Sequence, residues 1–241
     1  MQPQLTPFDG VLLVDKPAGL TSHDVVDRVR RHFGFKKVGH CGTLDPAATG
    51  LLILVLERAT KLQDRLMSDD KMYEGTMLLG VSTDSQDADG KVIAEKLVPP
   101  LTEEDIDRVF AKFRGDLQQV PPMVSAVKHQ GTPLYKLARK GKTVEREPRL
   151  VHIYDLRVLG LELPRVRLRV ACTKGTYVRT LCSDVGDVLG CGAHLYELRR
   201  MRSGDFDVKD AHSLETILEQ TREELKASII PILKFIGSSA P

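Results

Sequence analysis

The stretch GHCGTLDPAATG at residues 39–50 leads directly into the apolar run LLILVL at 51–56. Three glycines and one proline in twelve residues are typical of a tight loop, and a continuous apolar run is typical of a strand buried on both faces. Pro46 restricts the residue before it, Asp45, to an extended conformation. The pattern predicts a rigid loop that presents Asp45 next to a core strand. Taken alone, it fits a plain Asx-turn better than a catalytic loop.

The segments on either side of this loop predict short strands and helices. Before it, VLLV at 11–14 predicts a strand, and Ser22 is the expected cap of an amphipathic helix that Gly34 ends. After it, the spacing of apolar residues predicts a helix over 59–66 and a strand over 71–81.

The second half of the chain continues in the same mixed fashion. Thr102 opens a helix with a capping-box pattern, and residues 174–190 read as a loop that runs into a helix. Residues 193–206 predict a strand and a turn, and 213–227 predict helices. Strict alternation at 165–170 predicts a strand with one face made only of arginines, namely Arg165, Arg167 and Arg169.

Strands and helices that mix without regular βαβ alternation predict an α+β fold with a large mixed, mostly antiparallel sheet and flanking helices. We expect residues 8–236 to form one domain. Only 37 residues follow Gly204, fewer than the roughly 50 that typical domains need, so no separate C-terminal domain is expected. Residues 121–149 hold four prolines and seven Lys or Arg against two Glu, which predicts a basic insertion on the surface.

The composition is that of an ordinary globular protein of 241 residues, 41% apolar and 28% charged. The start MQPQLTPFDG lacks the basic and apolar parts of a signal peptide, and no apolar run approaches the length of a membrane span. No C-x-x-C pair is present, so we expect no metal site and reduced thiols in a cytoplasmic protein at four positions: Cys41, Cys172, Cys182 and Cys191.

An Asp-rich segment, TDSQDADG at 83–90, invites a calcium-binding interpretation. An EF-hand loop aligned on it would need acidic residues where Ser85 and Lys96 stand. A polar turn between strands is therefore the expected structure.

The net charge of +2 hides an uneven distribution. Residues 203–241 carry four basic and seven acidic side chains, and the rest of the chain carries 31 basic and 26 acidic ones. Basic side chains cluster at 28–37, 139–149 and 199–202. Each cluster alone is explained by solvated surface charge, but together they favour a polyanion such as nucleic acid as the partner.

Five separated motifs, in one order, resemble those of the TruB-type tRNA pseudouridine synthases over about residues 10–202. They are GVLLVDKPAGLTSHDVV (10–26), VGHCGTLDPAATGLLIL (38–54), KMYEG around Tyr73, KGTYVRTL (174–181) and LGCGAHLYELRR (189–200). The resemblance implies the pseudouridine synthase fold and the isomerisation of uridine 55 in the TΨC loop of tRNA to pseudouridine. The base is cleaved from C1′, turned and rejoined through C5, with no metal or other cofactor. Many family members continue into a C-terminal PUA domain, which we do not expect here.

The resemblance also assigns three catalytic residues. Asp45 matches the catalytic aspartate, and Arg179 matches the arginine that holds and orients it. Tyr73 matches the tyrosine that stacks on the flipped base, and a second role as a base in proton transfer is implied. The residues leave open whether Asp45 attacks C1′, attacks C6 or helps to form a glycal.

Four further residues are expected to bind the substrate. Tyr177 matches a tyrosine of the substrate pocket, and Leu198 matches a residue whose backbone contacts the uracil. His40 matches a histidine of the RNA-binding loop, and we expect it to bind rather than to act as an acid or base. Lys61 matches a lysine that is expected to meet backbone phosphate.

The remaining implications concern support and partners. Lys16 and Pro17 match a K-P motif that supports the catalytic loop, and the insertion at 121–149 corresponds to the family's thumb, which closes over the T-arm. The expected partner is therefore the T-arm of a tRNA. We expect a monomer that needs no protein partner.

Other functions are left open by the residues. One is a tRNA-binding or tRNA-folding module in which catalysis is secondary, and another is a guide-RNA-dependent relative of dyskerin. Phosphoryl transfer through an aspartyl intermediate is disfavoured, because the chain has neither the Walker glycines and lysine nor an Asp-x-Asp beside Asp45.

Overall fold

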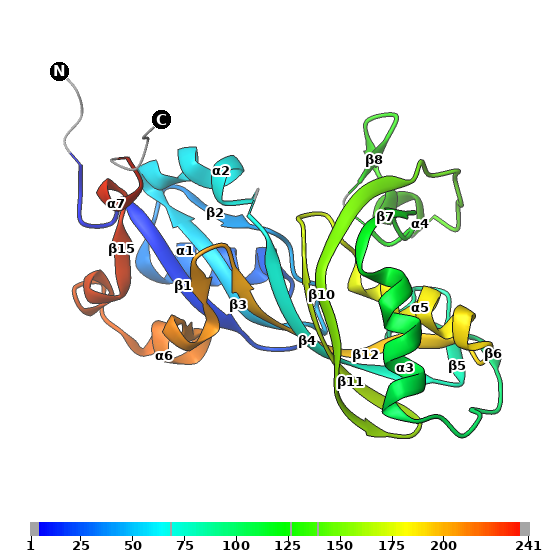
Figure 1. Ribbon diagram of the computed structural model, residues 1–241. Helices are drawn as coiled ribbons and strands as arrows, with labels where there is room; N and C mark the ends of the chain where they lie inside the picture. Colours follow the sequence, from blue (N-terminus) through cyan, green and yellow to red (C-terminus); the bar gives the residue numbers. More distant parts are fainter. Residues whose placement is uncertain (1–4, 68, 126, 139, 237–241) are drawn as a thin grey trace. The chain divides into compact units, whose positions relative to one another are not determined.

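The computed structural model (Figure 1) describes four stretches of the chain, namely 5–67, 69–125, 127–138 and 140–236. These residues form two compact units. The first unit holds the chain up to Lys71 and from Arg199 onward, and the second holds Met72–Leu198. That residues 8–236 form one domain stays a prediction.

The first unit combines strands with short helices. In chain order its described elements are β1 (Gly10–Lys16), α1 (Ser22–Phe33), β2 (Val38–Cys41), β3 (Thr49–Leu56), the 3-10 helix η1 (Glu57–Leu62), α2 (Gln63–Met67), the end of β12 (Ala193–Ser203), β13 (Phe206–Asp207), η3 (Val208–Asp210), β14 (His212–Ser213), α6 (Leu214–Glu219), η4 (Glu224–Ser228), β15 (Ile229–Pro231) and α7 (Leu233–Ile236).

Strand β3 is the centre of this unit. It pairs antiparallel with β1 and β2 and parallel with the end of β12, where Arg200 lies beside Gly50. On its other edge β1 pairs parallel with β14 and antiparallel with β15. All six residues of the run 51–56 are fully buried, which confirms the predicted core strand.

Helix α1 follows the predicted pattern except at its cap. Its apolar stripe is buried, and Gly34 ends it in the left-handed conformation. The N-cap is Thr21, whose side chain accepts from the Asp24 N–H in a capping box. The prediction that Ser22 caps the helix is therefore wrong, because the Ser22 hydroxyl is used by the loop 39–50.

The second unit contains the longer strands and helices. Its described elements are β4 (Lys71–Leu79, from Met72 on), β5 (Val81–Thr83), β6 (Val92–Glu95), α3 (Glu103–Phe110), the 3-10 helix η2 (Ala111–Phe113), β7 (Gly115–Gln119), β8 (Lys128–His129), β9 (Thr132–Pro133), α4 (Leu134–Ala138), β10 (Arg149–Glu162), β11 (Arg165–Cys172), α5 (Val178–Leu189) and the first part of β12.

The sheet of the second unit follows the order β12-β4-β11-β10-β7, and β10 pairs antiparallel with β11 and β7. Helix α3 packs against β10 and α5, as Figure 1 shows. On β11 the side chains of Val166, Leu168 and Val170 are buried on one face, and the arginines occupy the other. The mixed sheet with flanking helices confirms the predicted α+β class.

One other prediction needs correction. The helix expected over 59–66 is mostly a 3-10 helix, η1, followed by the short α2. The helices expected over 213–227 are present as α6 and the 3-10 helix η4, with Gln220 extended after α6. In the segment 59–66 the predicted inward residues Ala59 and Leu66 are buried.

The basic insertion at 121–149 holds only small elements. Strands β8 and β9 form a two-stranded hairpin, and α4 follows at once. Arg146 donates to the carbonyl oxygen of Pro121 at 3.0 Å, which ties the two ends together. Arg139 lies outside the described residues. Within the described part of the chain, no helix is long and apolar enough to cross a bilayer.

Candidate active site

The loop 39–50 lies in the first unit, and glycine is needed at its end. Gly50 has a φ of +97° and sits against the backbone of β12. A Cβ atom at Gly50 would lie 2.3 Å from the carbonyl oxygen of Arg200, closer than any real contact. Gly50 therefore allows β3 and β12 to approach closely at the end of the loop.

Arg200 holds the same loop through its side chain, which is 1% exposed. Its Nε donates to the carbonyl oxygen of Leu51 at 2.7 Å, and its Nη2 donates to that of Gly42 at 3.0 Å. A buried guanidinium that binds two carbonyl oxygens fixes both ends of the segment between them. The position of Asp45 within that segment is thereby restricted.

Lys16 forms a second buried cation beside the loop. Its Nζ donates to the carbonyl oxygens of Leu20 at 2.6 Å, Pro17 at 2.9 Å and Pro46 at 3.2 Å. Burial lowers the pKa of Lys16 to about 8, and the attraction of the nearby Asp45 carboxylate opposes this shift. The ammonium group remains charged at neutral pH, so it favours the ionised form of Asp45.

The residues next to Asp45 are also bound. Ser22 Oγ accepts from the Leu44 N–H at 2.8 Å and lies 3.2 Å from the Leu44 carbonyl oxygen, to which it donates. The Ala48 N–H donates to the Asp45 carbonyl oxygen at 3.1 Å. Asp45 itself is half-buried. The backbone on both sides of this carboxylate is therefore tied into the unit.

Three other predicted residues of the first unit differ in exposure. His40 is half-buried on β2, and burial together with the positive charge of Arg200 lowers its pKa. Its buried Nδ1 has no hydrogen-bond partner among the described residues. A neutral imidazole of this kind suits binding better than acid catalysis. Lys61 and Pro17 are exposed.

In the second unit, Arg179 is buried in the first turn of α5, with 4% of its surface exposed. It donates to Asp87 Oδ2 at 3.0 Å and to the Val124 carbonyl oxygen at 2.9 Å. Asp87 belongs to the segment expected to be only a polar turn. Its carboxylate fixes the Arg179 guanidinium, and nothing in the local sequence pairs these two residues.

The other predicted residues of the second unit lie on strands or at a helix end. Tyr73 is 9% exposed on β4. Tyr177 is the N-cap of α5, and its backbone N–H and carbonyl oxygen both bind the Gln119 side chain, at 2.8 and 3.0 Å. Leu198 is half-buried on β12. The Gln119 amide thus positions Tyr177, a role that the sequence did not indicate.

Metal ligation finds no support in the described residues, among which no group of three or more His, Cys, Asp or Glu side chains could hold an ion. The four cysteines are buried. Burial raises the pKa of the Cys41 thiol to about 12, which keeps it protonated.

A family model now accounts for most of the chain. The model of the TruB family pseudouridylate synthase, N-terminal domain, matches residues 30–178. The chain belongs to the TruB family. The model of the tRNA pseudouridylate synthase B C-terminal domain matches residues 179–234.

Two TruB-family relatives carry the name tRNA pseudouridine synthase B. That of Opitutus terrae is 52% identical over 225 residues, which cover 93% of each chain. That of Syntrophotalea carbinolica is 48% identical over 230 residues, which cover 94% of this chain and 75% of the relative.

Solved structures agree with the TruB-family fold. A chain from the crystal structure of a Cbf5-Nop10-Gar1 complex is 32% identical, with a TM-score of 0.75 over 95% of this chain. A chain from the structure of an H/ACA RNP bound to a substrate RNA containing 2′-deoxyuridine is 29% identical, with a TM-score of 0.71. This chain spans 61% and 60% of those two chains.

In this TruB-family chain the predicted site residues are divided between the units. The first unit brings Lys16, Asp45 and the residues around them into one network. Arg200 is its main unexpected member, because the basic cluster at 199–202 indicated only solvated surface charge or contact with a polyanion. Its neighbour Arg199 is also engaged, in an ion pair with Asp15 at 2.6 Å.

Proposed function

We propose that this chain converts uridine 55 in the TΨC loop of tRNA to pseudouridine, with Asp45 as the catalytic carboxylate. The relatives named tRNA pseudouridine synthase B, at 52% and 48% identity, support the tRNA as substrate. The hydrogen bonds that hold the loop around Asp45 are the observation that supports this role of Asp45.

The reaction needs a carboxylate that is ionised and fixed. The C1′–N1 bond breaks, the uracil turns and the C5–C1′ bond forms. C5 then loses its proton and N1 gains one, so the product has the same formula as the substrate. The buried Lys16 ammonium favours the charged form of Asp45. Ser22 binds the Leu44 N–H before it, and Arg200 binds the Leu51 carbonyl oxygen after it. These bonds limit the motion of the carboxylate before the reaction.

The residues of the second unit complete the proposal. A stacked base cannot be reached by a side chain, so the uridine is flipped out. The uracil ring stacks on the ring of Tyr73. The Tyr73 side chain also accepts a proton in a later step of the reaction. Arg179 orients the catalytic carboxylate, Tyr177 lines the pocket, and Leu198 binds the uracil through its backbone.

Further contacts with RNA belong to the same proposal. His40 contacts the RNA in its flipped conformation. Lys61 binds a backbone phosphate, which the exposure of the Lys61 side chain permits. The thumb at 121–149 closes over the T-arm. Lys16 and Pro17 support the catalytic loop, and the bond from Lys16 Nζ to the Pro46 carbonyl oxygen favours that role.

The direct test replaces Asp45 by Asn. We expect Asp45→Asn to release no tritium from tRNA labelled at C5 of uridine 55, a loss of at least about a thousandfold in rate, because an amide is neither a nucleophile nor a base. Binding of the tRNA should remain within a few fold. Asp205→Asn makes the same chemical change at an exposed turn and should keep full activity. Equal release by Asp45→Asn and the wild type would refute the assignment.

We also propose that the chain acts alone, as a cytoplasmic monomer without guide RNA, protein partner, metal or other cofactor. Purified chain and an unmodified tRNA transcript in EDTA should suffice for turnover. A need for a second RNA or protein would instead favour the guide-dependent function. Rescue of a deletion strain by Asp45→Asn would favour a tRNA-folding role.

A further inference from the structure

The second unit contains a pocket of about 370 Å³ that none of the proposed catalytic residues line. It lies over four neighbouring strands, β12, β4, β11 and β10. Polar and charged side chains dominate its walls, and its lining residues are Thr76, Gly160, Glu162, Arg165, Arg167, Tyr196 and Glu197. This volume is at the lower end of the range of small-molecule sites and fits a single nucleotide.

The pocket faces away from Tyr73. Successive side chains on a strand alternate between faces, so Glu74 and Thr76 share one face of β4 and Tyr73 lies on the other. Glu74 accepts from Arg169 at 2.6 Å, which places the arginine face of β11 on the Glu74 side. The pocket therefore lies on the face of the sheet opposite to Tyr73.

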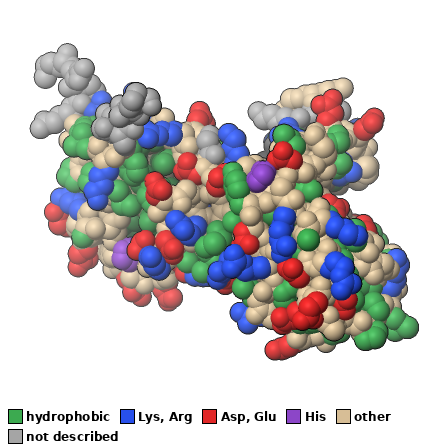
Figure 2. Space-filling view, viewed as in Figure 1, with side chains coloured by type: hydrophobic (Ala, Val, Ile, Leu, Met, Phe, Trp, Pro, Cys, Tyr) green, Lys and Arg blue, Asp and Glu red, His purple; other side chains and the backbone are tan. Residues whose placement is uncertain are grey.

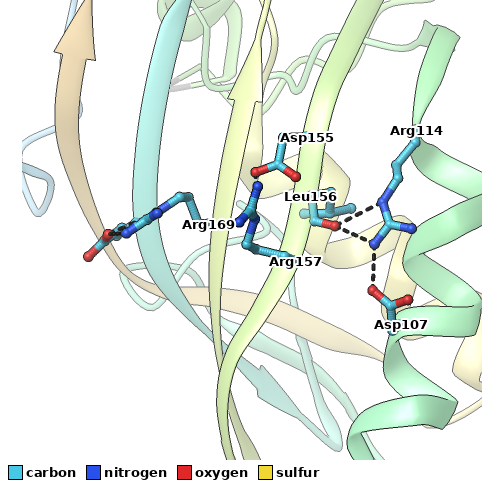
Figure 3. Close-up of polar contacts among 7 residues, drawn as sticks. Asp107, Arg114, Asp155, Leu156, Arg157 and Arg169 are labelled. Carbon is cyan, nitrogen blue, oxygen red and sulfur yellow. Dashed lines mark hydrogen bonds and ion pairs between the residues drawn. The ribbon is translucent and has the colours of Figure 1, made fainter.

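Most arginines near this sheet have partners. Figure 3 shows three of these arginines with their partners. Arg157 binds Asp155, Arg114 binds Asp107 and the Leu156 carbonyl oxygen, and Arg169 binds the Glu74 carboxylate. On the face of the second unit seen in Figure 2, basic and acidic side chains are likewise intermingled. Neutralised arginines of this kind add little to the binding of an anion.

Arg165 and Arg167 differ from these arginines. Both are exposed, and neither has a hydrogen-bond or ion-pair partner among the residues that the structure describes. The Arg165 guanidinium lies 5.4 Å from the centre of the Tyr196 ring. Tyr196 is 39% exposed. Two guanidinium groups and an aromatic ring are thus available to a ligand.

Gly160 opens the floor of the pocket. It pairs with Arg167 across β10 and β11, beside a register shift between Val158 and Gly160. A Cβ atom at Gly160 would have only the Arg167 side chain near it, at 4.0 Å. A glycine inside a strand often marks a bulge or a close approach by a ligand. Here its missing side chain leaves room above the sheet.

We propose that this pocket binds one unpaired nucleotide of the tRNA substrate, outside the catalytic site. Arg165 and Arg167 bind the phosphate, and the base stacks against the plane of Tyr196 or of the Arg165 guanidinium. Glu162 and Glu197 accept from the amino or imino groups of the base. The inference rests on the proposed function only in taking RNA as the substrate.

The charge balance favours a nucleotide over a bare anion. Two arginines and two glutamates line the pocket, so its formal charge is zero. A free phosphate would gain from the arginines and lose to the carboxylates. A nucleotide presents an anionic group and hydrogen-bond donors at different ends, which matches both pairs of side chains.

The first test is the double variant Arg165→Gln/Arg167→Gln. Its affinity for an unmodified tRNA transcript should fall about tenfold, and the slope of log K against log salt should become shallower by about one to two. The control Arg157→Gln removes one positive charge from a paired arginine on β10 and should change neither quantity. Melting curves should agree for all three chains.

A second variant fills the pocket without removing charge. Gly160→Val adds a β-branched side chain that suits a strand and should weaken tRNA binding to a similar degree. Loss of affinity in the arginine variant but not in Gly160→Val would mean that the arginines act outside the pocket, and would overturn the proposal. Unchanged affinity in both variants would overturn it as well.

Turnover distinguishes this inference from the proposed function. In both pocket variants kcat at saturating tRNA should equal that of the wild type, while KM rises about tenfold. If the wild type itself neither binds tRNA nor forms pseudouridine, the proposed function fails. If the wild type does both and the variants match it, only the pocket fails.

Discussion

The loop 39–50 and the thumb 121–149 are both irregular and both have basic side chains beside them, but they are held in different ways. The loop is bound by two buried cations, Lys16 and Arg200, which donate to the carbonyl oxygens of Pro46 and Gly42. The described residues of the thumb form a two-stranded hairpin and one short helix, and Lys140 and Lys142 are exposed.

Burial decides what a basic residue does in each segment. A buried cation that binds carbonyl oxygens fixes the backbone, because releasing it would leave charged and polar groups unpaired in the interior. An exposed lysine has no such constraint and contributes mainly a long-range field. The contacts of the loop thus fix the backbone around one carboxylate, whereas Lys140 and Lys142 leave positive charge exposed to solvent.

Among the substitutions that test this comparison, Arg200→Met should lower the free energy of unfolding the most. Two buried carbonyl oxygens would lose their donor, at about 1–3 kcal/mol each, so the free energy of unfolding should fall by about 2–5 kcal/mol. Catalysis should fall with it, because the segment around Asp45 is no longer fixed. Urea unfolding and tritium release measure the two effects.

The exposed Arg202→Met, two residues further along β12, is the matched control for Arg200→Met. It should change stability by less than about 0.5 kcal/mol. If both variants lost the same small amount, the loop would not depend on a buried cation.

The Lys16 side chain gives a pH-dependent test of the same network. Its pKa is about 8 in the folded protein and about 10.4 in an unfolded chain. Between these values the unfolded state binds the proton and the folded state does not. The stability of the wild type relative to Lys16→Met should therefore rise with pH from about 8 to 10.4, by up to about 1.4 kcal/mol per unit.

Below pH 8 both states of Lys16 are protonated, so the stability difference between the wild type and Lys16→Met should not change with pH there. Urea unfolding of both chains from pH 7 to 10.5 provides the measurement. A stability difference that stays constant over the whole range would mean that burial does not lower the pKa of Lys16.

Local patterns sufficed to predict much of the fold. The apolar run 51–56 predicted the buried strand, the alternation at 165–170 predicted the arginine face of β11, and Thr102 caps α3 through Asp105 as its spacing indicates. In each case the signal lies within one element, where periodicity and capping determine the structure.

The contacts that hold the candidate site are long-range, and the sequence did not indicate them. Arg200 is buried because β12 pairs with β3, and it binds Leu51, which is 149 positions away. Asp87 pairs with Arg179 across 92 positions. By residue type Ser22 is a slightly better cap than Thr21, but the Ser22 hydroxyl accepts from the Leu44 N–H and Thr21 caps the helix instead.

Substitutions in the thumb should weaken the binding of tRNA and leave the stability of the protein almost unchanged, which is the opposite of the effect expected in the loop. Lys140→Gln/Lys142→Gln removes two charges from exposed positions, so the free energy of unfolding should change by less than about 0.5 kcal/mol. The KM for tRNA should rise several fold, and the slope of log KM against log salt should become shallower by about one to two. Because these lysines do not hold the carboxylate, kcat should stay constant. A fall in kcat with an unchanged KM would mean that the thumb positions the reacting groups, and the contrast between the two segments would not hold.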